Sequence, residues 1–294
     1  MTATKTNDKY RSIRLEQGTI RYREYGTGAP VVFVHGLLVN GSLWRRVVPL
    51  VAQGYRCIVP DLPLGSHEVA MEEGADLTPK GLARLIAGFV EALGLESATL
   101  VGNDTGGALS QIVAVEHPER VARLVLTNCD AFDRFPPPEF APLVWGARVP
   151  GFLWELAQSM RIDAVRRSPL AYGWLTKRRI DDAVLDEWTR PFIERADVRR
   201  DLGAVLRGIS PRYTIEAAER LRTFDRPVLL VWAPEDRFFP LAHAVRLEAL
   251  LPDARLETID DSRTFIPEDQ PERLAGLVTE FLAATARPTL AVAG

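Results

Sequence analysis

The segment LVGNDTGGALSQ, residues 100–111, constrains the fold of this chain more than any other. A buried apolar run enters a turn flanked by glycines, and a helical pattern follows at once. Gly102, Asp104 and Gly106 have the spacing of a nucleophile elbow, a tight strand-to-helix turn that exposes one reactive side chain. The pattern predicts a carboxyl group presented at the carboxyl edge of a sheet. The alternative is that Asp104 only caps the helix as an Asx turn.

The strands around this turn are predicted from short apolar runs at residues 18–25, 30–35, 56–61, 98–102, 122–128, 227–233 and 254–259. Their hydrophobicity is continuous, which indicates burial on both faces and therefore parallel strands covered by helices. Only the first run alternates enough for an antiparallel edge. Helical patterns occupy intervals at residues 79–93, 107–116, 241–250 and 270–284. The predicted fold class is α/β, with a mostly parallel, doubly wound sheet.

A long segment, residues 132–216, interrupts this alternation because it contains no convincing strand. The sheet pattern resumes at Pro227, and a loop of this length without structure of its own is uncommon. We therefore predict a helical cap at 132–216, inserted into an α/β core formed by residues 1–131 and 217–294. The alternative, a separate C-terminal domain, fits the resumed pattern less well.

The composition excludes several classes of protein. Apolar residues make up 47% of the chain and charged residues 26%, values typical of a globular protein rather than a disordered one. The net charge of −3 argues against nucleic acid as a partner. The apolar runs are too short to span a bilayer and the N-terminus lacks a signal-peptide core, so we predict a cytoplasmic protein with no membrane partner. Cys57 and Cys129 lie in apolar runs, which predicts buried free thiols and no metal site.

A second motif, PVVFVHGLLVNGSLW at residues 30–44, is a strand that ends in His35 and Gly36 and continues into a loop and a helix. In a sheet of this kind, the loop supplies a backbone amide that polarises a substrate oxygen, and Leu37 is the predicted donor. We predict a structural role for His35, through hydrogen bonds to loop carbonyl groups.

Taken together, these motifs resemble the α/β-hydrolase fold, and specifically its Asp-nucleophile branch of haloalkane dehalogenases and epoxide hydrolases. The similarity covers nearly the whole chain and includes WAPEDRFFP at 232–240 and DSRTFIPEDQPERLAGLVTEFL at 261–282. It implies that Asp104 is a nucleophile that forms an alkyl ester, which water later cleaves. It also implies that the amides of Leu37 and Thr105 form the oxyanion hole.

The resemblance assigns the acid of the catalytic triad to Asp236, after the strand at 227–233. The alternative is a surface residue at the start of a helix, where acids are favoured. Asp130 is another position where the family sometimes places this acid, but an ordinary structural role is the favoured interpretation there.

The chain departs from the family at the catalytic histidine, because Thr264 occupies that position in DSRTF. Loss of a triad member costs on the order of 10⁴-fold in activity. His67, in the loop after a central strand, is the candidate substitute base, and the alternative is a solvated loop histidine. The positions that hold the leaving halide in dehalogenases are here Thr105 and Leu37, and Asn40 is a candidate replacement.

Substrate contacts are predicted from aromatic residues of the cap. Trp145 and Trp174 either pack the cap or line a pocket for an apolar or aromatic small molecule. Tyr172 and Tyr213 resemble the cap tyrosines that protonate the opening oxygen in epoxide hydrolases, although a packing role is the default.

We therefore expect an α/β-hydrolase-fold enzyme, similar to a haloalkane dehalogenase or epoxide hydrolase but with an incomplete triad, that acts on a small, largely apolar molecule through Asp104. Two alternatives remain open. One is a lyase, isomerase or cyclase in which Asp104 is a base, and the other is an inactive receptor for small molecules. No cofactor or metal is implied, and the oligomeric state is left open.

Overall fold

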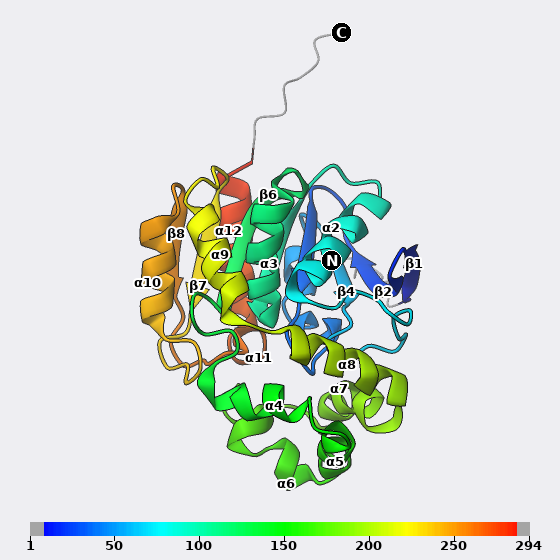
Figure 1. The fold of residues 1–294 in the computed structure, drawn as a ribbon. Coiled ribbons are helices and arrows are strands. Elements are labelled where there is room, and N and C mark those ends of the chain that lie inside the picture. The colour runs from blue at the N-terminus through cyan, green and yellow to red at the C-terminus, as the bar shows by residue number, and fades with distance from the viewer. Residues whose placement is uncertain (1–8, 287–294) are drawn as a thin grey trace.

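One eight-stranded sheet forms the centre of the molecule (Figure 1). The computed structural model describes residues 9–286. Residues 1–8 and 287–294, with which the predicted core begins and ends, lie outside the described residues. The strand order is β1-β2-β4-β3-β5-β6-β7-β8. The strands are β1 (Arg11–Leu15), β2 (Gly18–Tyr25), β3 (Pro30–Val34), β4 (Arg56–Asp61), β5 (Ala98–Asp104), β6 (Val121–Cys129), β7 (Val228–Trp232) and β8 (Ala254–Thr258).

The sheet is mostly parallel, as predicted. Strand β2 pairs antiparallel with β1 and β4, and the other neighbouring strands pair parallel. The continuous apolar runs are explained by burial on both faces. In β3, Val32 and Val34 pack in one core cluster while Val31 and Phe33 pack in the other.

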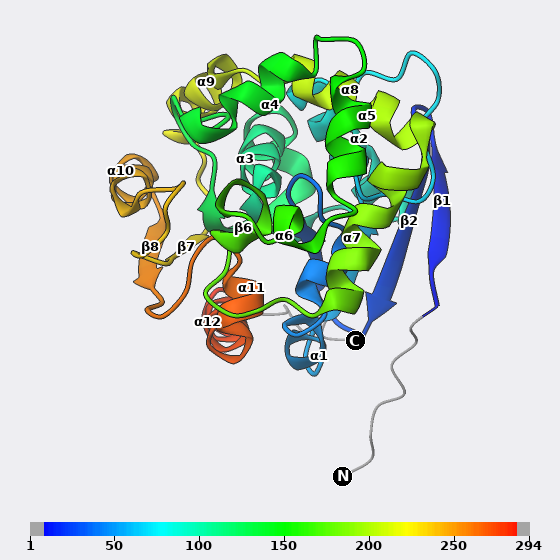
Figure 2. The ribbon, with the colours of Figure 1, turned by 90° about the horizontal axis from the view of Figure 1, so that it is seen from below.

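Helices cover both faces of the sheet (Figure 2). On one face lie α1 (Val48–Val51) and α12 (Pro271–Ala284). The other face carries α2 (Pro79–Ala92), α3 (Thr105–Glu116), α9 (Pro211–Leu221) and α10 (Leu241–Leu250). A short helix, α11 (Ile266–Asp269), precedes α12.

The segment between β6 and α9 is helical. It contains α4 (Ala141–Gly146), α5 (Phe152–Ser159), α6 (Asp163–Arg166), α7 (Asp182–Glu194) and α8 (Ala196–Gly208), with single turns at Pro138–Phe140 and Pro169–Gly173. We call α4 to α8 the inserted helices. The predicted boundary after residue 216 falls inside α9. This helix buries Tyr213, Ala217 and Leu221, one turn apart, and packs beside α3 rather than among the inserted helices.

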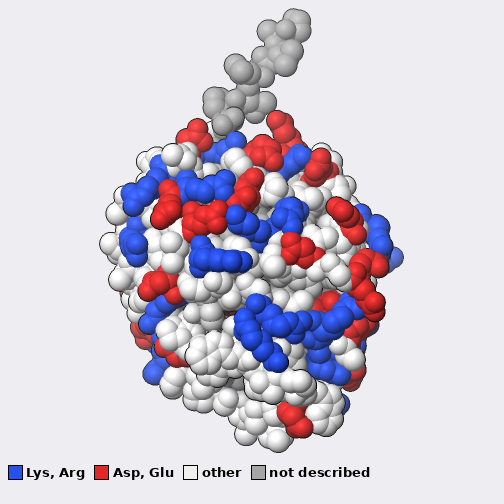
Figure 3. Space-filling view, in the orientation of Figure 1, with Lys and Arg blue, Asp and Glu red and all other residues white. Residues whose placement is uncertain are grey.

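The molecular surface differs between these two parts. Lysines and arginines intermix with acidic residues over the sheet and its helices, whereas the area over α4 to α6 is largely uncharged (Figure 3). In the segment from α4 to the turn at Pro169–Gly173, large apolar side chains are exposed at Trp145, Val149, Trp154, Ile162 and Leu170. Cys57 and Cys129 are buried and free, as predicted. Within residues 9–286, no helix has the length and apolar character needed to cross a membrane.

Candidate functional site

Asp104 lies at the tight turn between β5 and α3, where the sequence predicts an elbow. Its backbone has φ +55° and ψ −132°, which a residue with a side chain rarely adopts. The turn also brings backbone into close approach, since a Cβ atom added at Gly106 would lie 2.3 Å from the carbonyl oxygen of Val34. A strained residue held by such close packing is characteristic of functional sites.

Two backbone N–H groups hold the Asp104 carboxyl group. Leu37, in the loop after β3, and Thr105, at the start of α3, both donate to it. The loop approaches so closely that a Cβ atom added at Gly36 would lie 2.0 Å from Asp104 Oδ2. Burial raises the pKa of Asp104 to about 7, although the two N–H groups oppose this shift, and the nearby Asp236 adds to it. Asp104 can therefore exchange a proton near neutral pH.

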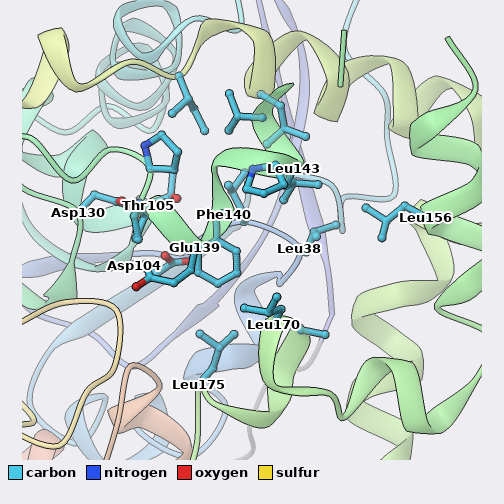
Figure 4. Close-up of a pocket in the computed structure, with 18 of the residues that line it drawn as sticks. Leu38, Asp104, Thr105, Asp130, Glu139, Phe140, Leu143, Leu156, Leu170 and Leu175 are labelled. Atoms are coloured by element: carbon cyan, nitrogen blue, oxygen red, sulfur yellow. Dashed lines mark hydrogen bonds between the residues drawn. The ribbon is translucent and has the colours of Figure 1, made fainter. Parts of the chain in front are cut away.

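Asp104 lines a cavity of about 250 Å³ beneath the inserted helices. Asp104, Thr105 and Asp130 lie together on one side of it, and leucines surround the remainder (Figure 4). The apolar lining comes from Leu37, Leu38, Phe135, Pro136, Pro137, Phe140, Pro142, Leu143, Val144, Phe152, Leu156, Met160, Leu170, Ala171, Leu175, Leu206 and Ile209. This lining suits a small, largely apolar molecule.

Asp130 is a second carboxyl group in the cavity lining. It follows β6 directly and is 1% exposed. Thr105 Oγ1 donates to its Oδ2 at 3.4 Å, while its Oδ1 has no hydrogen-bond partner among residues 9–286. Burial and the neighbouring Asp104 raise the pKa of Asp130 well above the usual range.

Asp236 lies beyond β7 and is well supplied with donors. The N–H groups of Phe238 and Phe239 donate to its Oδ1 at 2.7 and 3.1 Å, and Asn128 Nδ2 donates to its Oδ2 at 2.8 Å. Burial raises the pKa of Asp236 to about 6 in spite of these bonds. Thr264 is fully buried close to Asp236. Its hydroxyl group has no hydrogen bond of ordinary geometry among the described residues.

His67, the predicted substitute base, does not line the cavity. Its Nε2 lies 3.1 Å from Oδ2 of Asp201 in α8, and both side chains are buried. Through this contact, the imidazole connects the loop after β4 to helix α8. His35 accepts from the N–H of Leu62 at 2.8 Å, and burial lowers its pKa to about 4, which suits the structural role predicted for it.

The predicted substrate contacts divide into two groups. Tyr172 lines the cavity, where its hydroxyl donates to the carbonyl oxygen of Leu38 at 2.5 Å. Asn40, Trp145 and Trp174 are absent from the described cavity lining. Asn40 caps a helical turn and donates to Glu187, Trp145 is 72% exposed, and the guanidinium of Arg237 stacks on Trp174.

Sequence reasoning missed most of the cavity lining and the environment of Asp130. The lining contributed by α4 and α5 has a signal in the sequence, because Leu143, Phe152 and Leu156 belong to helical apolar patterns. No local signal distinguishes Asp130 from an ordinary loop acid. Its unpaired oxygen depends on which side chains reach it from distant segments.

Comparisons with known proteins identify the family to which this fold belongs. A family model described as the alpha/beta hydrolase fold matches residues 29–271. A relative from Mycobacterium tuberculosis named haloalkane dehalogenase 2 is 30% identical over 90% of this chain and 91% of its own length. A 2-hydroxy-6-oxo-6-phenylhexa-2,4-dienoate hydrolase from Comamonas testosteroni is 27% identical over 90% of this chain and 91% of its own. The structure of an epoxide hydrolase has the same fold, with a TM-score of 0.79, 17% identity and coverage of 95% of this chain and 99% of that one.

Proposed function

Since the chain belongs to the α/β hydrolase fold family and is a hydrolase-like enzyme, we propose that it acts on a small, largely apolar molecule by proton transfer through the carboxyl group of Asp104. One observation carries this proposal: Asp104 faces an apolar cavity, has a pKa of about 7, and has no histidine beside it in the described lining. A general base is most effective when its pKa is close to the pH at which it works.

Completion of a hydrolytic cycle has little support at this site. An ester on Asp104 needs a base that activates water, and the family position for that base holds Thr264. His67 is committed to Asp201, and three N–H donors occupy Asp236. Proton transfer by Asp104 needs none of these groups.

The reaction is balanced without water. The Asp104 carboxylate takes a proton from a carbon beside a carbonyl group, the C–H electron pair forms a C=C bond, and the carbonyl oxygen gains the displaced electron pair. If a C=C bond adjoins that carbon, the product is a dienolate, and return of the proton to its far carbon completes an isomerisation. If the neighbouring carbon bears a leaving group, departure of that group with its bonding pair, as the carbonyl re-forms, completes an elimination. The Leu37 and Thr105 N–H groups keep the carboxyl group in place.

A second candidate function is nucleophilic attack by Asp104, which the relative named as a dehalogenase favours. Here a bromoalkane would leave an alkyl ester on Asp104 and release bromide. The described lining opposes departure of an anion, because it contains the carboxyl groups of Asp130 and Glu139 and no Lys, Arg, Trp or Asn side chain. We therefore place proton transfer first.

Deuterium exchange tests the proposal. Acetophenone is incubated with the protein in D₂O, and uptake of deuterium into its methyl group is followed by mass spectrometry. We expect exchange with the wild type and a rate at least about 10²-fold lower with Asp104→Asn. Asp225→Asn, the same change at an exposed position, should exchange as the wild type does. Equal rates for the wild type and Asp104→Asn would contradict the proposal.

Intact-mass measurement distinguishes the second candidate. After incubation with 1-bromobutane or styrene oxide, a stable adduct on the wild type that is absent from Asp104→Asn would establish nucleophilic attack. Turnover restored by Thr264→His would then identify the missing base. If neither exchange nor adduct is observed while ligands still bind equally to the wild type and Asp104→Asn, the receptor interpretation holds.

A further inference from the structure

Asp130 combines three properties that rarely occur together in one carboxyl group. It is 1% exposed, it lines the cavity, and its Oδ1 has no hydrogen-bond partner among the described residues. Within residues 9–286, its only side-chain donor is Thr105 Oγ1, at 3.4 Å. An ionised carboxylate in this position would be costly, since buried charges are normally paired or hydrogen-bonded on both oxygens.

We propose that Asp130 carries a proton and donates it in a hydrogen bond to an oxygen atom of the ligand, so that the cavity selects small apolar molecules with one oxygen acceptor, such as a ketone. This inference rests on the proposed function and deepens it, because it assigns the group that meets the substrate oxygen while Asp104 acts on the adjacent carbon.

The charges around Asp130 support the protonated form. Asp104 shares the same side of the cavity, and two neighbouring carboxyl groups with no cation between them do not both ionise readily. The described lining offers no Lys or Arg side chain, and its other acid, Glu139, is exposed and lies 3.8 Å from Arg134. Burial and Asp104 together raise the pKa of Asp130 well above the usual range, which favours the protonated form.

The other buried acid beside the cavity differs in its donors. Asp236 receives N–H groups on both oxygens, from Phe238, Phe239 and Asn128, and is absent from the described lining. Asp130, in contrast, has an oxygen without a hydrogen-bond partner among the described residues, and it belongs to the residues that line the cavity. Two carboxyl groups whose surroundings separate their pKa values are suited to act as acid and base on one substrate.

The proton balance follows directly. As Asp104 takes a proton from the carbon beside the carbonyl, the C–H electron pair becomes a C=C bond and the carbonyl π pair moves to oxygen. The Asp130 O–H bond shares or transfers its proton to that oxygen, which leaves an enol. Return of a proton from Asp104 to carbon, at the original carbon or at the far carbon of a dienol, and of the enol proton to Asp130 restores the Asp104 carboxylate and the protonated Asp130.

Matched ligands test this inference by binding alone. Acetophenone and α-methylstyrene have nearly the same shape, but only the ketone accepts a hydrogen bond. Calorimetry should show that the wild type prefers the ketone by about tenfold. Asp130→Val should lose that preference. Asp130→Asn should retain part of it, because an amide N–H still donates, and this variant also serves if the valine variant does not fold.

The result separates this inference from the proposed function. In Asp104→Asn, the ketone preference should remain while deuterium exchange is lost. In the wild type, a ketone preference without any exchange would sustain the role of Asp130 and refute proton transfer by Asp104. Two results would overturn the inference: equal affinity of the wild type for both ligands, or an unchanged preference in a folded Asp130→Val protein. If Asp130→Val does not fold, Asp130→Asn provides the test instead. The inference would be overturned if this variant preferred the ketone at least as strongly as the wild type does and if the infrared C=O band of bound acetophenone were unshifted in both proteins.

Discussion

Asp201 on the one hand, and the cavity aspartates Asp104 and Asp130 on the other, form two sets with opposite surroundings. At the joint between the loop after β4 and helix α8, Asp201 accepts from His67, from the N–H of Met71 at 2.7 Å and from Arg200. These bonds lower the pKa of Asp201 in spite of its burial. In the cavity, Asp104 and Asp130 have raised pKa values and fewer donors. A buried acid with a full set of donors stabilises the fold, whereas one that lacks them at a cavity indicates chemistry.

The largest effect is expected at the paired acid. Asp201→Ala leaves the buried imidazole of His67 and the N–H of Met71 without their acceptor, so it should lower the free energy of unfolding by roughly 3–5 kcal/mol in urea titrations. The same change at the exposed Asp225 should have little effect. A loss below about 1 kcal/mol for Asp201→Ala would remove the contrast between the two sets.

Substitution of Asp104 is expected to change the free energy of unfolding in the opposite direction. Its folded pKa of about 7 exceeds the ordinary value of 3.8, so the folded state holds more protons than the unfolded state between these values. The contribution of Asp104 to stability is therefore fully present below about pH 4 and is lost as pH rises through 7. Asp104→Asn should stabilise the protein at pH 8 by on the order of 3 kcal/mol and add nothing at pH 4. Urea titrations at both pH values, with Asp225→Asn alongside, test this; a destabilised Asp104→Asn at pH 8 would refute it.

A smaller effect concerns how the cavity acid is held. Gly36→Ala places a methyl group 2.0 Å from Asp104 Oδ2, so it should cost roughly 1–3 kcal/mol of stability and abolish deuterium exchange. Gly88→Ala, in α2 with no atom within 4 Å of the added carbon, is the control and should be neutral or stabilising. Full exchange activity in Gly36→Ala would show that the close approach of this loop is dispensable.

The smallest effect is expected at Thr264. Its buried hydroxyl group interacts with Asp236 but makes no hydrogen bond of ordinary geometry among residues 9–286, so Thr264→Val exchanges a weakly bonded polar group for a methyl group. Thermal unfolding should show a change between zero and about 1 kcal/mol of stabilisation. A loss of more than about 1 kcal/mol would mean that this hydroxyl group supports Asp236.

Local sequence patterns predicted the elements that position the site. Continuous apolar runs identified β3 to β8, and the glycines around Asp104 identified the elbow, because burial and tight turns leave signals within a few residues. Strand β1, RSIRL, was missed, since an edge strand with exposed polar residues has no such signal. The helix α9 was divided at residue 216 because its apolar face gives no indication of which layer it joins.

The roles of single polar residues depended on partners far along the chain. His67 was a reasonable candidate base by position, but Asp201, 134 residues later, binds it. The exposure of Trp145 depends on which face of α4 meets the inserted helices, and helical periodicity does not specify that. Asp130 was interpreted as structural, and its unpaired oxygen emerges only when the cavity is assembled around it.

The most direct test of the raised pKa values of the cavity aspartates needs no substrate. Carboxyl carbons of ¹³C-labelled aspartate are titrated by NMR in the wild type and in Asp104→Asn. We predict one resonance with a midpoint near pH 7 that disappears in the variant, and a second, from Asp130, whose midpoint lies well above the ordinary acidic range. Titration of every aspartate resonance at ordinary acidic values would contradict the account.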